Sequence, residues 1–319
     1  MTIAEVRERV RAGGLLSGGS TVLAMVSGGR DSVCLLDIAV ALCGSARVRA
    51  LHVNYGLRAE SDGDELHCRE LCRLLEVEIE VVRANRQQGA VGNLHAWARA
   101  QRYEAAMALA ERRDALVATG HTASDHAETI LYRLAASPGR RALLGMGARE
   151  GRLVRPLLPI TREDTAEYCR QRGLRWREDS SNDNERYARA RVRHGLLPAL
   201  EAVHPAARAN VLRTAELLRE ETELLDALVD AELAGRASIA IDRLRELPAA
   251  LARLVVIRLA EDAAGTFVPQ AGERVGEILA LGARGGPAEL HVGGLAGARI
   301  ERGELHMVAI QPRAQHDGQ

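Results

Sequence analysis

The stretch SGGRDS, which begins at Ser27, combines two adjacent glycines with two hydroxyls and a carboxylate. Gly28 and Gly29 carry no Cβ, so their backbone N–H groups can closely approach a phosphate. Ser27 and Ser32 add hydroxyl donors, and a helix beginning here would direct its positive end at an anion. Because a carboxylate repels bare phosphate, Asp31 predicts a magnesium ion between itself and the phosphate oxygens. The alternative is a tight turn whose Asp31 and Ser32 only cap the helix.

A second pair of candidate groups lies in the stretch ATGHTASDHAET. Asp125 and Glu128 are three residues apart, so on a helix both carboxylates point the same way. Two such carboxylates could hold an ammonium group and accept its proton, which would make the amine nucleophilic. The alternative is a first helical turn enriched in acids because of the helix dipole.

Both stretches follow predicted strands. Short β-branched runs predict strands over Thr21–Val26, Val48–Tyr55, Val77–Ala84 and Asp114–Gly120. Three- and four-residue apolar spacing predicts helices over Ser32–Cys43, Asp62–Leu75 and Asn93–Arg112. This alternation is typical of an α/β fold with a parallel, doubly wound sheet, in which ligands bind beyond the carboxyl ends of the strands. The similar stretch SGGS, from Ser17, precedes its strand and has no Asp, so we interpret it as a turn.

The remainder of the chain predicts further domains. Pro205–Ala234 has the pattern of a long amphipathic helix, and short strands separated by glycines follow near the C-terminus. We therefore expect a catalytic domain over residues 1–199, a helical linker over 200–238 and a small α+β domain over 239–319. The linker helix is also a candidate surface for a homodimer.

Composition excludes some classes of function. The 319 residues are 47% apolar and carry no formal net charge, but residues 133–193 hold fifteen arginines against eight acidic residues. The chain contains no lysine, so Walker A and Schiff-base chemistry are excluded. None of the five cysteines forms a C-x-x-C pair. With a charged N-terminus and no apolar run of membrane-spanning length, we expect a cytoplasmic protein without a membrane partner.

SGGRDS resembles the PP-loop signature of the N-type ATP pyrophosphatase superfamily, which cleaves ATP between its α and β phosphates. Further stretches resemble those of tRNA(Ile)-lysidine synthetases, in family order and over about the first 200 residues. They are LHVNYGLRAESDGDELHCRELC, GNLHAWARAQRY, ATGHTASDHAETILYRL, and RPLLPITREDTAEYC followed by DSSNDNERYARARVRHGLLPAL.

The resemblance implies a reaction. Such an enzyme uses ATP and Mg²⁺ to adenylate the 2-carbonyl oxygen of the wobble cytidine in a minor tRNA(Ile) with a CAU anticodon. The ε-amine of free L-lysine then attacks the adjacent carbon and expels AMP. The product is lysidine, and the tRNA consequently reads AUA rather than AUG.

The resemblance also implies roles for individual residues. The residues implied at ATP and its phosphates are Ser27, Gly28, Gly29, Arg30, Asp31, Ser32, His52 and Arg58. The implied catalytic residues are Asp31, Asp125 and Glu128, with Asp31 reaching Mg²⁺ at the phosphates. The residues implied at the tRNA or the reacting cytidine are Arg99, Arg102, His121, Arg189 and Arg193, and the small domain over residues 239–319 is expected to help bind the tRNA. Arg99 and Arg102 could instead pair with acids, and His121 is expected to orient neighbours rather than act as a base.

The chain departs from the family pattern at several positions: His95 stands in place of Glu, Ser124 in place of Asp, His126 in place of Gln and Ala190 in place of Asn. The stretch AASPGRRALLGM is also only loosely similar to the corresponding family loop. Two other functions stay open. A PP-loop tRNA thiolase is similar over the first half, although thiolases generally need paired cysteines. A nucleotide-binding regulatory module would bind ATP without turning it over.

Overall fold

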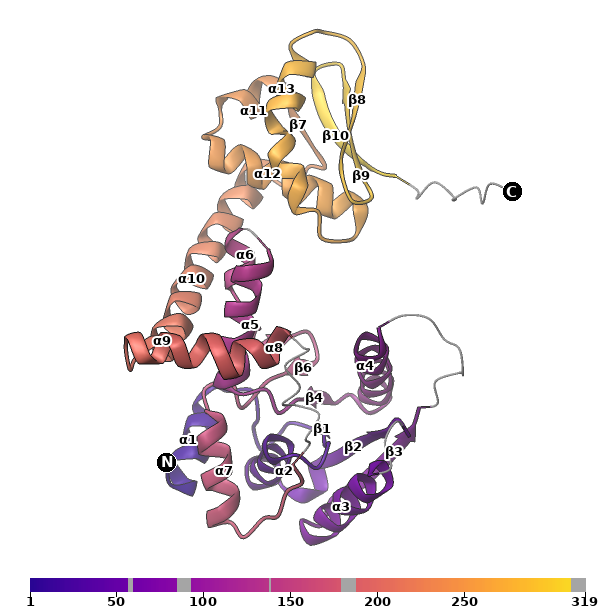
Figure 1. Cartoon of the computed structure of the whole chain (residues 1–319). Coiled ribbons are helices and arrows are strands. Elements are labelled where there is room, and N and C mark those ends of the chain that lie inside the picture. Colours follow the sequence, from indigo (N-terminus) through magenta and orange to yellow (C-terminus); the bar gives the residue numbers. More distant parts are fainter. Residues whose placement is uncertain (57–59, 85–92, 138, 179–187, 311–319) are drawn as a thin grey trace, which may run out of the picture. The chain divides into compact units, whose positions relative to one another are not determined.

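The computed structural model describes residues 1–56, 60–84, 93–137, 139–178 and 188–310 (Figure 1). The chain divides into two compact units, residues 1–216 and 217–319, and the division falls within helix α10 (Ala207–Leu233). The domain boundaries expected at residues 199 and 238 stay a prediction. Across the described ranges, every helix is too short or too polar to cross a lipid bilayer.

The first unit is built around a six-stranded sheet with the strand order β3-β2-β1-β4-β6-β5. Its strands are β1 (Val22–Met25), β2 (Val48–Asn54), β3 (Glu78–Arg83), β4 (Leu116–Ala118), β5 (Arg149–Glu150) and β6 (Leu153–Val154). All pairings are parallel except that of β5 with β6, which confirms the predicted α/β class. Two-residue strands carry no readable periodicity, so the β5–β6 hairpin could not be predicted. Because β1 lies between β2 and β4, the loop after β1 emerges where doubly wound sheets bind ligands.

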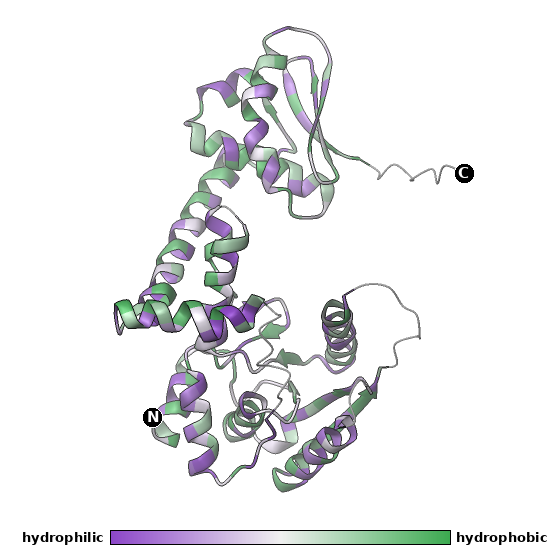
Figure 2. Ribbon diagram, in the orientation of Figure 1, coloured by the Kyte–Doolittle hydropathy of each residue, from purple (hydrophilic) through white to green (hydrophobic). Residues whose placement is uncertain are grey.

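Helices cover both faces of this sheet (Figure 1). The α-helices described between residues 3 and 203 are α1 (Ile3–Ala12), α2 (Arg30–Cys43), α3 (Ser61–Leu74), α4 (Leu94–Arg113), α5 (Ala123–Ala136), α6 (Arg140–Leu143), α7 (Arg162–Gln171), α8 (Ala188–Arg191) and α9 (Leu197–Val203). Alternate residues of β1 face opposite sides: Val22 and Ala24 pack with α2, α3 and α7, whereas Leu23 and Met25 pack with α4. Figure 2 shows that these helices carry both hydrophobic and hydrophilic residues, as expected of helices that pack one side on a sheet and turn the other to water.

A buried polar cluster joins helices α1, α2 and α7. The Asp37 carboxylate, 2% exposed, accepts a 2.5 Å hydrogen bond from the Tyr168 hydroxyl. The guanidinium groups of Arg7 and Arg172 donate to the same carboxylate at 2.8–3.1 Å. Burial alone would raise the pKa of Asp37, but these donors outweigh it and hold that pKa below its usual value. The cluster fixes α7 against α2, and both helices begin at the candidate site.

The second unit combines four strands with short helices. Its strands are β7 (Ser238–Ala240), β8 (Ala288–Gly293), β9 (Ala296–Glu301) and β10 (Glu304–Ala309), in the antiparallel order β7-β10-β9-β8. Its helices are α11 (Ile241–Glu246), α12 (Ala249–Ala264), the 3-10 helix η4 (Pro269–Arg274) and α13 (Val275–Gly282). Val255 and Val256 of α12 pack with Ile300 and Leu305 in one apolar core. The predicted small α+β fold is confirmed.

Candidate active site

The loop between β1 and α2 has a fixed backbone. Gly28 has φ of +84°, and a Cβ there would lie 3.3 Å from the His67 ring and 3.5 Å from the Cys68 sulfur. The Ser32 hydroxyl donates to the Gly29 carbonyl at 2.8 Å and accepts from the Ser27 backbone N–H at 3.1 Å. Position 28 therefore requires glycine for both its dihedral angle and its space.

The N-terminus of α2 differs from those of three other helices in the first unit. Helices α1, α5 and α7 each begin with a capping box, in which Thr2, Thr122 or Thr161 accepts from a first-turn amide. Helix α2 begins after Gly29, and within the described residues no side chain caps it. Its first-turn N–H groups are therefore available to an anion, which fits the phosphate groups of ATP.

Asp31 does not cap α2, so the simple turn interpretation of this residue is wrong. Its carboxylate accepts a 2.5 Å hydrogen bond from the Thr165 hydroxyl and a 3.3 Å hydrogen bond from Arg30 Nε. Burial is the largest cause of a raised Asp31 pKa, and the nearby negative charge of Asp125 raises it further. A cation beside Asp31 would relieve both effects. Among the described residues there is no group of three or more metal-ligating side chains, so a magnesium ion here would take its other ligands from phosphate and water.

Asp125 serves two functions at the start of α5. Its Oδ2 accepts from the Thr122 backbone N–H at 2.9 Å and from the Thr122 hydroxyl at 2.7 Å, which completes the capping box. Its Oδ1 accepts from Arg162 Nη2 at 2.7 Å. Burial opposes ionisation, but Arg162 and Thr122 outweigh it and hold the pKa of Asp125 below its usual value. One carboxylate oxygen of Asp125 thus caps α5, while the other binds Arg162.

Glu128, one turn further along α5, is 2% exposed. Arg193 donates to both of its carboxylate oxygens, from Nε at 2.8 Å and from Nη2 at 3.0 Å. Arg162 Nη1 donates to it at 3.1 Å. Arg162 Nε also lies 4.0 Å from the Asp31 carboxylate. One guanidinium thus links the three carboxylates that the sequence predicts as catalytic.

The start of α7 is held against the start of α5, which sets the position of Arg162. The Ala123 backbone N–H donates to the Ile160 carbonyl at 2.8 Å, and the Arg162 backbone N–H donates to the Ser124 hydroxyl at 3.1 Å. Sequence reasoning missed Arg162 and Thr165. Their signal was available, because the threonine at position 161 marks a helix N-terminus, which places residues 162 and 165 in its first turn.

The two predicted histidines come from the strands on either side of β1. His52 lies within β2, is 5% exposed, and its Nδ1 is 2.9 Å from the Val26 carbonyl just before the loop. His121 follows β4, and its Nδ1 lies 2.8 Å from the Thr119 hydroxyl. Burial, with smaller contributions from nearby arginines, lowers the pKa of His121 to about 4. His121 is therefore neutral at pH 7, and a neutral ring suits the predicted orienting role.

Arg99 and Arg102 lie on α4 beside an aromatic ring rather than within an ion pair that the structure records. Their guanidinium carbons are 4.7 Å and 5.8 Å from the centre of the Tyr103 ring. Both arginines act to lower the pKa of His121, which places their charges near the carboxyl end of β4. Their predicted contact with tRNA or the adenylate stays a prediction.

Arg189 and Arg193, four residues apart, have different surroundings. Arg189 is exposed on α8, whereas Arg193 is half-buried against Glu128. The π-helix η3 (Val192–Leu196) intervenes and alters the usual four-residue spacing. Pro198, in the first turn of α9, cannot donate a backbone hydrogen bond and would clash with the carbonyl four residues earlier, which favours the wider π turn.

Two of the positions that depart from the family pattern, Ser124 and Ala190, have described surroundings. The Ser124 hydroxyl accepts from the Arg162 backbone N–H and lies 3.3 Å from Arg208 Nη1, so it joins α5 to α7. Ala190 is buried on α8. Arg58, the DSSN stretch and the side chain of His95 lie outside the described residues.

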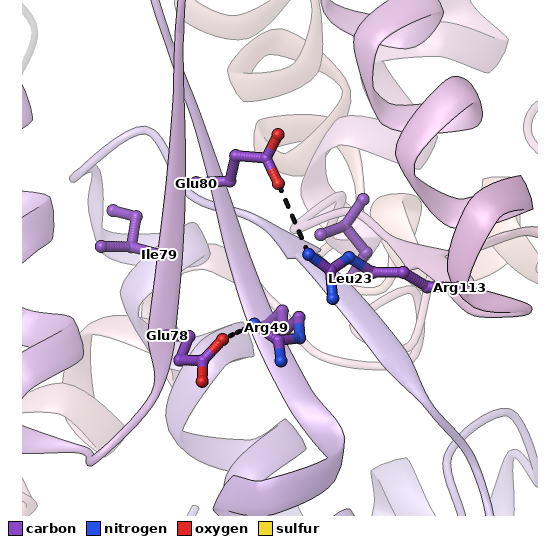
Figure 3. Close-up of a pocket in the computed structure, with 6 residues that line it drawn as sticks. All are labelled: Leu23, Arg49, Glu78, Ile79, Glu80 and Arg113. Atoms are coloured by element: carbon purple, nitrogen blue, oxygen red, sulfur yellow. Dashed lines mark ion pairs between the residues drawn. The ribbon is translucent and has the colours of Figure 1, made fainter.

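A separate surface pocket lies toward the amino-terminal ends of the strands, away from the candidate site at their carboxyl ends (Figure 3). It is lined by Leu23, Arg49, Glu78, Ile79, Glu80 and Arg113. Arg49 pairs with Glu78, and Arg113 lies 3.9 Å from Glu80. These residues come from the first half of three strands and from the end of α4, so this pocket is not part of the site. Its charges neutralise one another, which gives it no evident chemistry.

Comparison with known proteins adds to this geometry. The PP-loop domain family matches residues 4–200. The tRNA(Ile)-lysidine synthase of Pseudomonas fluorescens is 40% identical over 214 residues, covering 65% of this chain and 48% of that protein. The tRNA(Ile)-lysidine synthase of Nostoc sp. is 35% identical over 232 residues. That alignment covers 70% of this chain and 67% of the Nostoc protein. The chain spans about half the length of several curated relatives that it matches.

Among solved structures, a U34-tRNA thiolase from Methanococcus maripaludis has a similar fold. Its TM-score is 0.58 at 19% identity, over 68% of this chain and 78% of the thiolase. At this identity the likeness concerns the fold alone.

Proposed function

Because the chain belongs to the PP-loop family, we propose that it adenylates the wobble cytidine of a minor tRNA(Ile) with a CAU anticodon and then joins free L-lysine to it. Identity of 35–40% to proteins named tRNA(Ile)-lysidine synthase supports this substrate. One structural observation carries the chemistry: Arg162 links Asp31, beside the phosphate loop, to the carboxylates of Asp125 and Glu128. A nucleotide site and an amine site are thus adjacent.

In the first half-reaction, the cytidine 2-carbonyl oxygen attacks the α-phosphorus of ATP and pyrophosphate leaves. The backbone of Gly28 and Gly29 and the uncapped N-terminus of α2 would bind the phosphates. Mg²⁺, when bound, would supply positive charge to the phosphate oxygens, and Asp31 would hold it there. Arg30 and Arg162, both beside Asp31, would stabilise the negative charge that develops.

In the second half-reaction, the lysine ε-amine attacks C2 of the cytidine, the C2–O bond breaks and AMP leaves. Asp125 or Glu128 would accept the proton that the ammonium must lose. His121, neutral at pH 7, would orient neighbouring groups rather than carry this proton. The arginines at positions 99, 102 and 189 would contact tRNA phosphates or the cytidine, since guanidinium suits both.

Mass analysis of the tRNA nucleosides tests the reaction. After incubation with ATP, Mg²⁺ and L-lysine, we expect a cytidine heavier by one lysine less one water, formed with release of pyrophosphate. An exchange of oxygen for sulfur would indicate a thiolase. ATP binding without pyrophosphate release would indicate a nucleotide-binding module. Either result would contradict the proposal.

We also propose that the chain forms a homodimer through α10, in the cytoplasm where its tRNA and ATP are found. Leu217, Leu224 and Leu228 recur along this helix at intervals of seven and four residues. They are 43%, 64% and 47% exposed. An exposed leucine stripe at this spacing suits packing of one helix against another. Light scattering on the full chain, compared with Leu224→Glu, tests this assembly.

A further inference from the structure

The carboxylate pair, Asp125 and Glu128, is already occupied by two arginines. Arg162 donates to one oxygen of each carboxylate, at 2.7 Å and 3.1 Å. Arg193 donates to both oxygens of Glu128. The proposed function places the ammonium group of lysine at this same pair. The guanidinium groups of Arg162 and Arg193 therefore compete with the lysine ammonium group for the same carboxylate oxygens.

The hydrogen-bonding capacity of the pair limits what else it can bind. Two carboxylates offer about eight lone-pair directions. Six are used: Asp125 accepts two hydrogen bonds from Thr122 and one from Arg162, and Glu128 accepts one from Arg162 and two from Arg193. An ammonium group brings three donors and a positive charge that both guanidinium groups repel. It cannot bind fully unless one arginine leaves.

Arg162 is the arginine better placed to leave. Arg193 forms two parallel bonds with the buried Glu128, a strong geometry. Arg162 divides its bonds between two carboxylates, and its Nε lies 4.0 Å from Asp31, on the side of the phosphate loop. A polyphosphate bound at α2 would offer this guanidinium a partner of higher charge within a short displacement.

We propose that Arg162 makes lysine binding depend on the nucleotide: without nucleotide it occupies the carboxylate pair, and with nucleotide it moves to the phosphates and frees the pair for lysine. This inference rests on the proposed function and adds an order to it. Lysine would enter after ATP, when an adenylated cytidine can be formed for it to attack. By linkage, lysine would tighten nucleotide binding by the same factor.

Equilibrium dialysis of labelled L-lysine against the full chain tests this coupling. The measurement is made with and without Mg²⁺ and the α,β-methylene analogue of ATP. For the unchanged chain we expect the analogue to tighten lysine binding by about tenfold, within the usual range of coupling between sites. For Arg162→Gln we expect lysine binding without nucleotide to become tighter than in the unchanged chain. The ratio of lysine affinity with the analogue to lysine affinity without it should fall to about one.

Two further variants complete the test. Arg170→Gln is the matched control, because Arg170 lies on the same helix, is exposed and pairs only with Glu167 within the described contacts. Arg170→Gln should show the same ratio of lysine affinities, with and without the analogue, as the unchanged chain. Arg162→Lys keeps the charge but loses the planar fork, so its ratio should lie between those of the unchanged chain and Arg162→Gln. Thermal unfolding shows which variants are folded, and Arg162→Lys decides the question if Arg162→Gln is not.

The outcomes separate this inference from the proposed function. A ratio unchanged by the Arg162 substitutions would overturn the inference, as would lysine binding weakened equally in both conditions, which indicates a purely structural role. Lysine binding to the unchanged chain that ignores the nucleotide would also overturn it, while leaving the proposed function intact. Binding of the analogue with no lysine binding in either condition would contradict the proposed function itself.

Discussion

At the scale of single residues, neighbouring carboxylates with similar sequence signals have different environments. The Asp125 side chain is 23% exposed, and its carboxylate accepts hydrogen bonds both from the helix-capping Thr122 and from Arg162. Glu128 is buried and holds two guanidinium groups. Removing one partner of a buried ion pair is costly because the other charge is left without compensation. The two acids should therefore differ in what their loss does to stability.

We predict that Asp125→Asn and Glu128→Gln both abolish lysidine formation, but that only Glu128→Gln markedly destabilises the first unit. An asparagine can still accept from Thr122, whereas a glutamine at position 128 leaves Arg193 without its paired carboxylate and Arg162 with Asp125 as its main counter-charge. The expected loss for Glu128→Gln is about 3 kcal/mol in free energy of unfolding, measured by urea denaturation followed by circular dichroism. Equal midpoints for the two variants would contradict this difference.

His121 should make stability depend on pH. Its pKa is lowered from 6.5 to about 4 in the folded chain, so between those values the unfolded chain binds more protons. Folding is therefore weakened as pH falls from about 6.5 toward 4. Between pH 6.5 and 5 we expect a loss of about 1–2 kcal/mol that His121→Gln removes. The exposed His204→Gln is the control, and parallel pH profiles for all three proteins would refute the prediction.

At the scale of elements, the site depends on where helices begin. Helices α2, α5 and α7 each follow a turn at the edge of the sheet, and their first two turns supply Asp31, Asp125, Glu128 and Arg162. The Asp37 cluster fixes α7 against α2 further along both helices. Gly120, between β4 and α5, lies against the first turn of α2, where a Cβ would be 3.0 Å from the Asp31 carbonyl carbon and oxygen.

We predict that Gly120→Ala displaces the first turn of α2. Backbone atoms cannot yield as the end of a side chain does, so the overlap should cost about 1–3 kcal/mol. Affinity for an ATP analogue should fall by about tenfold, as measured by calorimetry. Gly19→Ala is the matched control, because a Cβ at position 19 would meet nothing within 4 Å. Unaltered nucleotide affinity in Gly120→Ala would show that this close approach is not needed.

At the scale of the whole molecule, charge is unevenly distributed although the total is zero. Residues 133–193 carry an excess of arginine, and they include α7, α8 and the start of η3. Some of these arginines are committed to carboxylates, as Arg162 and Arg193 are. Others, including Arg189, are exposed. The arginines paired with Asp125 and Glu128 organise the candidate site, and exposed arginines such as Arg189 add positive charge that would attract the phosphate backbone of RNA.

We predict that tRNA affinity falls steeply with salt and that Arg189→Gln weakens this dependence. Each phosphate contact contributes about one to the slope of log affinity against log salt. Loss of Arg189 should therefore reduce the slope by roughly one, as measured by filter binding over a salt series. Arg213→Gln, whose arginine is exposed but paired with Glu216, is the control. An identical slope for Arg189→Gln would remove this residue from the tRNA-binding surface.

The sequence by itself determined the strands β1 to β4, the helices between them and the glycine-containing turn after β1. It also indicated three candidate carboxylates, Asp31, Asp125 and Glu128, whose roles stay predictions. These features depend on local periodicity, glycine and spacing within one helix, which neighbouring residues encode. The tertiary structure alone decided that Arg162 and Arg193 occupy the carboxylate pair, and that Arg189 and Arg193 have different surroundings. Charges that meet across 34 or 65 residues of chain leave no periodic signal, because packing of α5, α7 and η3 brings them together.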